Sequence, residues 1–391
     1  MAETAHETRN TEKIYTNYRL QLPDQSLLGT LVVRDGCIVE VQPGRSQVSG
    51  AVDGNGDYLL PGLVELHTDN FERCLSPRPG VRWPMAAAAT YHDRDLAAAG
   101  VTTVCDAISI GDVTPSPGSL RVDMFGPMID ALTERQQQGQ FTVDHRLHLR
   151  CELGYEQVYE LVSTYAEHPL LSLMSLMDHT PGQRQFAKIE KYKEYYMGKH
   201  GVTAEQMDGF IEARLAAQRD HADRNRQSLV DLARTQQVAL ASHDDATEDH
   251  VQQAVQEGAV IAEFPTTLAA AKEAHTHGLQ VLMGAPNLVL GGSHSGNVSA
   301  MDLVGHGLVD VVSSDYVPQS LIQAMFLIAE TQDLPLHQAM ALFTSNPAKA
   351  IGLDCDRGSL EVGKRADWVA VNNAGAVPQI TAVYSQGQRV A

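Results

Sequence analysis

The sequence is poor in cysteine and in basic residues. Its 391 residues include five cysteines, an odd number with no Cys-x-x-Cys pair, which predicts free thiols in a reducing cytoplasm rather than a disulfide framework. Lysine and arginine together number 29, against 48 aspartates and glutamates. The resulting formal charge of -19 argues against nucleic acid as a partner for the chain as a whole.

The sequence also has no long hydrophobic run and no glycine-rich nucleotide loop. No segment reaches the ~18 to 20 uncharged apolar residues that a membrane span requires, and the polar residues 1–13 show no export signal. We therefore expect a cytoplasmic protein with no membrane partner. Neither GxxxxGKS/T nor GxGxxG follows the first apolar strand-like run of the middle segment, which disfavours nucleotide binding by those routes.

Both ends of the chain contain short strand-like runs separated by glycine turns. Residues 14–60 include the hairpin signal Arg34-Asp-Gly36. Residues 358–390 likewise contain short strand-like runs separated by glycine turns. The simplest packing is one small composite β-sandwich domain made from residues 1–60 and 353–391. With 43% apolar and 20% charged residues overall, the long middle segment, 61–352, can bury a large core of its own.

The middle segment alternates apolar strand-like runs with helical patterns. Eight such runs are present, at residues 63–69, 102–107, 146–152, 170–178, 238–243, 260–264, 281–285 and 309–315. Eight strands that alternate with helices predict an α/β fold, a parallel (β/α)8 TIM-like barrel; an open doubly wound sheet is the alternative. The longest interruption, an insertion at 180–237, is locally basic and rich in tyrosine.

Histidines and carboxylates gather at the ends of these runs, where a barrel of this type carries its reacting groups. The strand-end groups are His67-Thr-Asp69, Asp106, Arg150-Cys-Glu152, Asp178-His179, His243-Asp-Asp245, Glu263, Asn287 and Asp315. Residues two apart on a strand share a face, so His67 and Asp69 point the same way, as do Arg150 and Glu152. Imidazole nitrogens combined with carboxylate oxygens suit Zn2+, Mn2+ or a similar ion.

A single histidine of this kind is more often a hydrogen-bonded structural residue than a ligand. Three strand-end histidines together with Asp69, Glu152 and Asp315 favour a site for one or two divalent metal ions, Zn2+ or Mn2+. The histidines placed elsewhere are expected to be structural, namely His92, His145, His148, His275, His277, His306 and His337.

Several stretches carry a resemblance to a known family. Pro61-Gly-Leu-Val-Glu-Leu-His67-Thr-Asp69, with Thr344-Ser-Asn-Pro347-Ala far downstream, resembles the amidohydrolase superfamily. Within it, His145-Arg-Leu-His-Leu-Arg-Cys-Glu152, Ser175-Leu-Met-Asp-His179 and Ser313-Ser-Asp-Tyr316 resemble the diphosphatases of the carbon-phosphorus lyase pathway of phosphonate catabolism. The resemblance covers nearly the whole chain. It implies a metal-bearing (β/α)8 barrel with a small β domain from both termini.

Carried over by position, the resemblance also implies a ligand set and a reaction. The implied metal ligands are His67, Asp69, Glu152, His179, His243 and Asp315. Asp69 stands where most of the superfamily has a second histidine, which makes one metal position richer in oxygen. The implied reaction is hydrolysis of a small anionic ribose 5-triphosphate to pyrophosphate and the 5-phosphate, with Asp315 as the general base for the attacking water.

A highly anionic substrate requires a locally positive site in this acidic protein. The candidate substrate-binding residues are Arg78, Arg150, Arg184, Lys188, Lys191, Tyr192, Gly292, Ser293, His294 and Ser295. Arg150 is favoured because strand register holds it on the same face as Glu152. For the others, an ordinary glycine turn or a solvated helix face is the alternative interpretation.

Two other functions are compatible with the pattern. A cyclic amidase or deacylase of the same superfamily would share the barrel, because fold does not fix chemistry. It would not require the basic insertion or the glycine-rich segment 291–297. A non-enzymatic scaffold is disfavoured by the presence of all six implied ligands. A homo-oligomeric assembly is compatible with the sequence.

Overall fold

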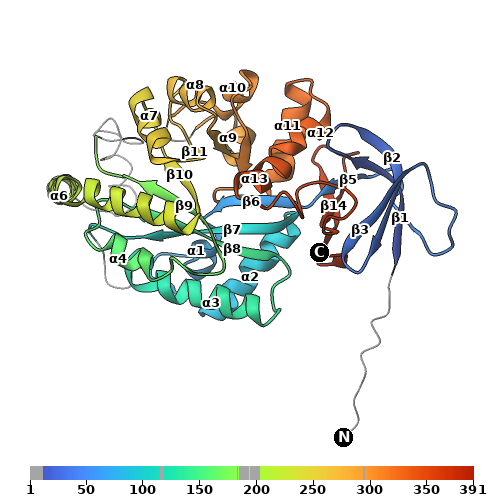
Figure 1. Ribbon diagram of the computed structural model, residues 1–391, viewed down its shortest axis with the longest axis horizontal. Helices are drawn as coiled ribbons and strands as arrows, with labels where there is room; N and C mark the ends of the chain where they lie inside the picture. The colour runs from blue at the N-terminus through green and yellow to red at the C-terminus, as the bar shows by residue number, and fades with distance from the viewer. Residues whose placement is uncertain (1–11, 115–118, 183, 185–192, 194–202, 294–295) are drawn as a thin grey trace, which may run out of the picture.

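The computed structural model describes residues 12–114, 119–182, 184, 193, 203–293 and 296–391 (Figure 1). It consists of a strand-and-helix barrel with a smaller sheet at one end. Among the described residues, every helix is too short or too polar to cross a lipid bilayer.

Eight parallel strands form the barrel. They are β6 (Leu63–Thr68), β7 (Val101–Ile110), β8 (Asp144–Glu152), β9 (Leu171–Met177), β10 (Ala239–His243), β11 (Ile261–Glu263), β12 (Gln280–Gly284) and β13 (Val311–Ser313). Each strand pairs in parallel with the next one along the chain. A single bridge between Thr68 and Asp315 joins the two ends of this sheet and nearly closes it. The predicted barrel is confirmed, and the open sheet is excluded.

Helices cover the outside of the barrel, with α2, α3 and α4 on one side of the strands and α7, α8 and α11 on the other (Figure 1). The helices are α1 (Asn70–Leu75), α2 (Met85–Ala98), the π-helical turn η1 (Leu120–Met124), α3 (Phe125–Gln137), α4 (Val158–Ser163), α6 (Ala204–Gln236), α7 (Glu248–Glu257), α8 (Leu268–Thr276), α9 (Ala285–Leu290), α10 (Ala300–Gly305), α11 (Ser320–Thr331), α12 (Leu336–Ala341) and α13 (Ser345–Ala350). A capping box formed by Thr203 and Gln206 starts α6. The described part of the insertion 180–237 is therefore mainly one long helix.

The small domain is built from both termini, as predicted. Its strands are β1 (Lys13–Gln21), β2 (Ser26–Arg34), β3 (Cys37–Pro43), β4 (Val52–Asp53), β5 (Tyr58–Pro61), β14 (Trp368–Asn372), β15 (Gln379–Ser385) and β16 (Gln388–Arg389). Hydrogen bonds join all eight in one mixed sheet, because β5 pairs antiparallel with β14. Trp368 packs edge-to-face on Tyr15, with ring centroids 4.6 Å apart.

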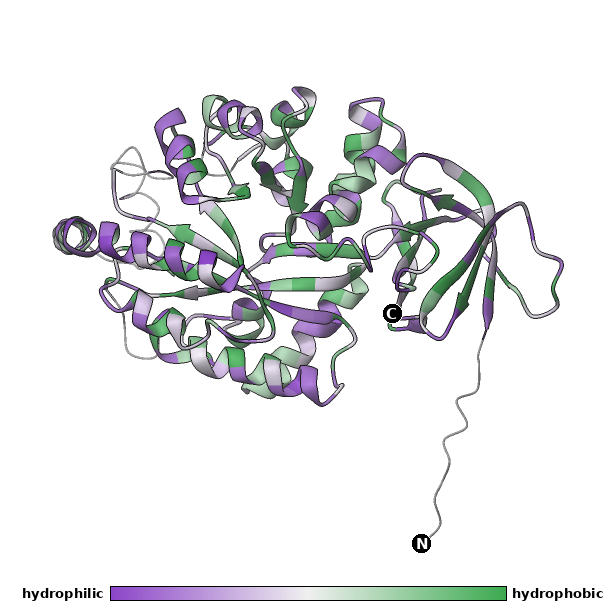
Figure 2. Ribbon diagram, in the orientation of Figure 1, coloured by the Kyte–Doolittle hydropathy of each residue, from purple (hydrophilic) through white to green (hydrophobic). Residues whose placement is uncertain are grey.

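The inside of the barrel is filled by an apolar cluster. Its buried members on the strands are Val64, Leu66, Cys105, Leu173, Ala241, Ile261, Leu282 and Val311. They come from seven of the eight strands, which only the barrel interior brings together. The outer helices mix hydrophilic and hydrophobic residues (Figure 2). The strand ends that follow this apolar layer are free to carry polar groups.

A buried network of charged side chains holds α2 against the barrel wall. Asp106 on β7 accepts hydrogen bonds from His92 on α2 at 2.5 Å and from His145 on β8 at 2.7 Å. The other ring nitrogen of His145 lies 3.4 Å from Asp93, so His145 faces a carboxylate at both nitrogens. Two acceptors require two ring protons, and this histidine is therefore an imidazolium. It has the structural role that the sequence predicts for it.

This network predicts a specific pH dependence of stability. Burial lowers the pKa of His145, but Asp106 and Asp93 raise it overall from 6.5 to about 9. A group whose pKa is raised on folding stabilises the native state fully below its unfolded pKa and loses that effect as the pH rises through its folded pKa. We expect the free-energy difference between wild type and His145→Gln to shrink by roughly 3 kcal/mol between pH 6 and pH 9.5. Urea unfolding of both proteins measures this difference. A constant difference across that range would contradict the ionised state of His145.

Candidate metal centre

The predicted ligands lie at the carboxyl ends of five barrel strands. His67 and Asp69 stand at the end of β6, Glu152 ends β8, His179 follows β9, His243 ends β10 and Asp315 follows β13. The carboxyl ends of parallel strands meet at one rim of a barrel, so residues far apart in sequence come together there. The structure places all six at this rim, in two adjoining groups.

The first group is formed by His67, Asp69 and Asp315. Their candidate ligand atoms all lie within 4.8 Å of one another. His67 is almost fully buried, whereas the Asp69 side chain is 35% exposed. Backbone bonds fix the group, because the Asp69 N–H donates to the Asp315 carbonyl at 2.7 Å and the Asp315 N–H donates to the His67 carbonyl at 3.0 Å. Two partly exposed carboxylates and one buried imidazole therefore lie close together at the rim.

The second group is formed by His179, His243 and Asp244, whose candidate ligand atoms also lie within 4.8 Å of one another. Glu152 supports it, since its Oε2 accepts from His179 Nδ1 at 2.6 Å and its Oε1 from the His179 backbone N–H at 3.2 Å. Burial raises the pKa of Glu152, but His179 lowers it overall to about 2, so the carboxylate is ionised. The rings of His67 and His243 stack at 5.9 Å between centroids, which joins the two groups into one site.

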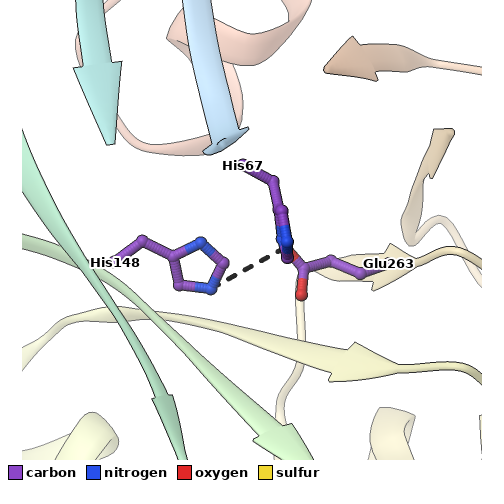
Figure 3. Close-up of side chains that lie close together, drawn as sticks. All are labelled: His67, His148 and Glu263. Carbon is purple, nitrogen blue, oxygen red and sulfur yellow. Dashed lines mark hydrogen bonds and ion pairs between the residues drawn. The ribbon is translucent and has the colours of Figure 1, made fainter. Parts of the chain in front are cut away.

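Glu263, at the end of β11, holds the two stacked histidines (Figure 3 shows it beside His67). Its Oε1 accepts from His67 Nδ1 at 3.0 Å, and its Oε2 accepts from His243 Nδ1 at 3.1 Å. A carboxylate that accepts from Nδ1 leaves Nε2 of each ring as the ligand atom, the arrangement that orients histidines in many metal sites. Burial raises the pKa of Glu263, but the surrounding histidines hold it well below its ordinary value.

His148 points toward His67 and Glu263 (Figure 3), but both of its ring nitrogens form hydrogen bonds with other protein groups. Nδ1 donates to the Leu66 carbonyl at 2.9 Å, and Nε2 accepts from the Ser175 hydroxyl at 2.9 Å. Burial lowers its pKa to about 3, which keeps the ring neutral. His148 Nε2 also lies 3.7 Å from Glu263 Oε1, and candidate ligand atoms of His67, His148 and Glu263 lie within 4.8 Å of one another.

Two of the rim carboxylates lie on backbone in the left-handed region. Asp244 has φ 56° and Asp315 has φ 55°, a conformation that residues other than glycine rarely adopt. Asp244 directly follows the last residue of β10, and Asp315 lies two residues after the end of β13, so each presents a short polar side chain at the rim. Unfavourable backbone of this kind is concentrated at functional sites.

The described substrate-binding candidates differ in what they contact. Arg150 Nη1 donates to Asp69 Oδ1 at 2.7 Å, on the ligand side of β8. Arg184 is buried, and its guanidinium donates to the His243 carbonyl at 2.9 Å and pairs with Asp245. Arg184 thus supports the turn after β10, while Arg150 lies at the rim beside a candidate ligand.

The other candidates lie in loops. Arg78 is exposed between α1 and α2, and Gly292 and Ser293 follow α9 with partial exposure. The predictions for Lys188, Lys191, Tyr192, His294 and Ser295 fall outside the described residues.

Glu263 and Asp244 are the site residues that the predicted ligand set leaves out. Both are strand-end carboxylates, so the signal that identifies the rim includes them. Their roles depend on which ring nitrogen each faces, and strand position alone does not determine this.

The donor set suits a divalent metal ion. Glu263 directs the Nε2 atoms of two imidazoles, and the neighbouring carboxylates of Asp69, Asp244 and Asp315 supply oxygen atoms within 4.8 Å of them. Mixed imidazole and carboxylate donors are typical of Zn2+ and Mn2+ sites. On its buried side the site is supported by Glu263 and His148, which are 1% and 0% exposed, so the imidazoles are held by partners that solvent does not reach.

The fold and this rim define a class of protein. The model of the amidohydrolase family matches residues 193–391, and the chain belongs to that family of metal-dependent hydrolytic enzymes. Among curated relatives, the chain is 47% identical over 379 residues, 96% of its own length and all of the relative's, to the alpha-D-ribose 1-methylphosphonate 5-triphosphate diphosphatase of Escherichia coli strain K12.

Solved structures show the same fold at much lower identity. A Xaa-Pro dipeptidase with bound methionine matches with a TM-score of 0.66 at 14% identity, covering 97% of this chain and 99% of the other. Molinate hydrolase matches with a TM-score of 0.65 at 14% identity, covering 97% and 94%. These similarities show a shared fold and nothing about function.

Proposed function

We propose that this enzyme hydrolyses alpha-D-ribose 1-methylphosphonate 5-triphosphate to pyrophosphate and the 5-phosphate, in phosphonate catabolism in the cytoplasm. The observation that carries the proposal is the convergence of His67, His243 and Asp315 at one rim, in a chain 47% identical over 96% of its length to a diphosphatase of that substrate. The proposal assigns His67, Asp69, Glu152, His179, His243 and Asp315 to one or two divalent ions, Zn2+ or Mn2+.

The residues of the rim account for the steps of such a hydrolysis. Asp315 accepts the proton of a water molecule whose oxygen attacks the phosphorus next to the ribose. The bond from that phosphorus to the bridging oxygen breaks, and pyrophosphate leaves. The rim residues would hold a divalent ion, which when bound would supply Lewis acidity toward water and a phosphoryl oxygen. Glu263 keeps the imidazoles in one tautomer throughout.

The positive charge required by the substrate comes from few described residues at the rim. Arg150 is mostly buried, with a side chain 8% exposed, and its position beside Asp69 is fixed by the register of β8. Because water is largely excluded there, its charge acts on a nearby phosphate more strongly than a solvated lysine does. We therefore propose Arg150 as the principal described contact to the triphosphate.

We expect Arg150→Met to raise KM for the triphosphate by roughly 10-fold to 100-fold, the value of one charge-assisted hydrogen bond. Steady-state kinetics at saturating metal ion measures this. Arg146→Met is the matched control, because Arg146 lies on the same strand but pairs with Asp144 at its start. If KM rises equally in both variants, or in neither, Arg150 does not contact the substrate.

Product analysis tests the proposed reaction. Metal-reconstituted protein is incubated with the triphosphate, and the products are followed by phosphorus NMR. We expect one pyrophosphate for each 5-phosphate formed. Parallel incubations use hydantoin and dihydrouracil. Ring opening without pyrophosphate release would show that the enzyme is a cyclic amidase, and release of orthophosphate alone would place the attack at the wrong phosphorus.

A further inference from the structure

The seam of the barrel, where the first strand meets the last, is not an ordinary strand pair. At its lower level the Val64 N–H donates to the Phe343 carbonyl and the Val312 N–H donates to the Leu342 carbonyl, both at 2.9 Å. Residues 342–343, between α12 and α13, thus lie between β6 and β13 at this level. Their carbonyls accept the hydrogen bonds that each strand would form with its neighbour in a regular sheet. The two strands pair directly only at Thr68 and Asp315, near the rim.

Between these two levels the Glu65 side chain bridges β6 and Ser314, the residue after β13. Its Oε1 accepts from the His67 backbone N–H at 2.7 Å, and its Oε2 accepts from the Ser314 backbone N–H at 2.6 Å. Glu65 is 1% exposed, and the pairing of β6 with β7 is irregular between Glu65 and Thr68. The side chain therefore takes the place of a missing strand neighbour for both N–H groups.

The two residues held in this way belong to the rim. One is His67 itself, and the other is the neighbour of Asp315. Each carboxylate oxygen takes one donor, so the width of a single carboxylate fixes the separation of the two strands directly beneath the site. Glutamine has one accepting oxygen and one NH2 group, and its NH2 group would face an N–H donor.

We propose that Glu65 is a positioning residue that sets the distance between His67 and the Asp315 carboxylate and thereby the affinity of the site for its metal ion. This inference rests on the proposed metal site. Residues that orient metal ligands from behind typically contribute roughly 10-fold to 100-fold in metal affinity. Glu65 acts across the seam on backbone positions, whereas Glu263 acts on the side chains of His67 and His243.

Asp93 provides a matched control for a purely structural role. It is likewise 1% exposed, and its Oδ1 accepts the backbone N–H groups of Thr142 and Val143 at 2.9 and 3.0 Å. It lies on α2, against the segment that precedes β8, and its hydrogen-bond partners are Thr142, Val143 and His145, which lie away from the rim. Asp93→Asn therefore removes one buried carboxylate charge, which pairs with His145, away from the candidate ligands.

The test measures metal affinity of metal-free protein by titration calorimetry with Zn2+ and with Mn2+. We expect Glu65→Gln to weaken binding by roughly 10-fold to 100-fold, whereas Asp93→Asn loses thermal stability and keeps the wild-type affinity. If Glu65→Gln fails to fold, Glu65→Asp replaces it; its side chain is one methylene shorter and cannot span the same two donors, and we expect a loss of roughly 10-fold.

The outcomes separate this inference from the proposed function. Wild-type affinity in the folded Glu65 variant, or an equal loss in Asp93→Asn, would overturn the positioning role and leave the metal site intact. Absence of binding to the wild-type protein would instead refute the proposed function itself.

Discussion

Replacing Asp315 with asparagine is expected to lower the rate of pyrophosphate release by roughly 10²-fold to 10⁴-fold, the usual contribution of a general base, and to preserve the fold. The substitution keeps size and shape but removes the basic carboxylate. The backbone of this residue is fixed on both sides, by donation to His67 and acceptance from Asp69. Asparagine also tolerates the left-handed conformation found here.

The measurement is steady-state release of pyrophosphate, with circular dichroism and the melting temperature as evidence of folding. Asp310→Asn is the control, because Asp310 lies just before the same strand at its opposite end and bonds to the Val281 N–H. The control is expected to turn over at the wild-type rate. Near-normal turnover of Asp315→Asn would remove Asp315 from the role of base.

The second large effect is expected for Glu263→Gln. The wild-type carboxylate accepts from Nδ1 of both His67 and His243, and glutamine can accept from only one of them. The other imidazole then loses the bond that fixes its tautomer and its orientation. We expect metal affinity to fall by roughly 100-fold, the upper end of the effects seen for such partners.

Metal titration of the purified apo-protein measures this effect. Glu257→Gln serves as the control, since Glu257 is a partly buried carboxylate that pairs with Arg226 at 3.1 Å on the outside of the barrel. Its loss should leave the affinity unchanged. Wild-type affinity in a folded Glu263→Gln protein would mean that the two histidines do not bind the ion through Nε2.

The strands and the rim could be predicted from the sequence because their signals are local. Each apolar run overlaps one barrel strand, and the polar residues at the run ends lie together because parallel strands end at one rim. Asp244 and Glu263 were visible as strand-end carboxylates in the same way. Their contacts could not be predicted, because whether a carboxylate binds the ion or supports a histidine depends on which ring nitrogen it faces.

Long-range contacts account for what the sequence could not predict. The bond from Ser314 to Glu65 spans 249 residues, and no local pattern indicates that a glutamate will fill the seam of a barrel. The bonds of the Arg184 guanidinium to His243 and Asp245 are also contacts between segments about 60 residues apart, which no local pattern indicates. The single sheet of the small domain likewise depends on β5 meeting β14 from the far end of the chain.

Metal content is the most direct test of the central claim that strand-end side chains bind a divalent ion. Wild-type protein and a His67→Ala/His243→Ala double variant are dialysed against metal-free buffer and analysed by mass spectrometry for Zn and Mn. We predict at least one ion per chain in the wild type and far less than one in the folded double variant. A metal-free wild type, or equal content in both proteins, would contradict the account.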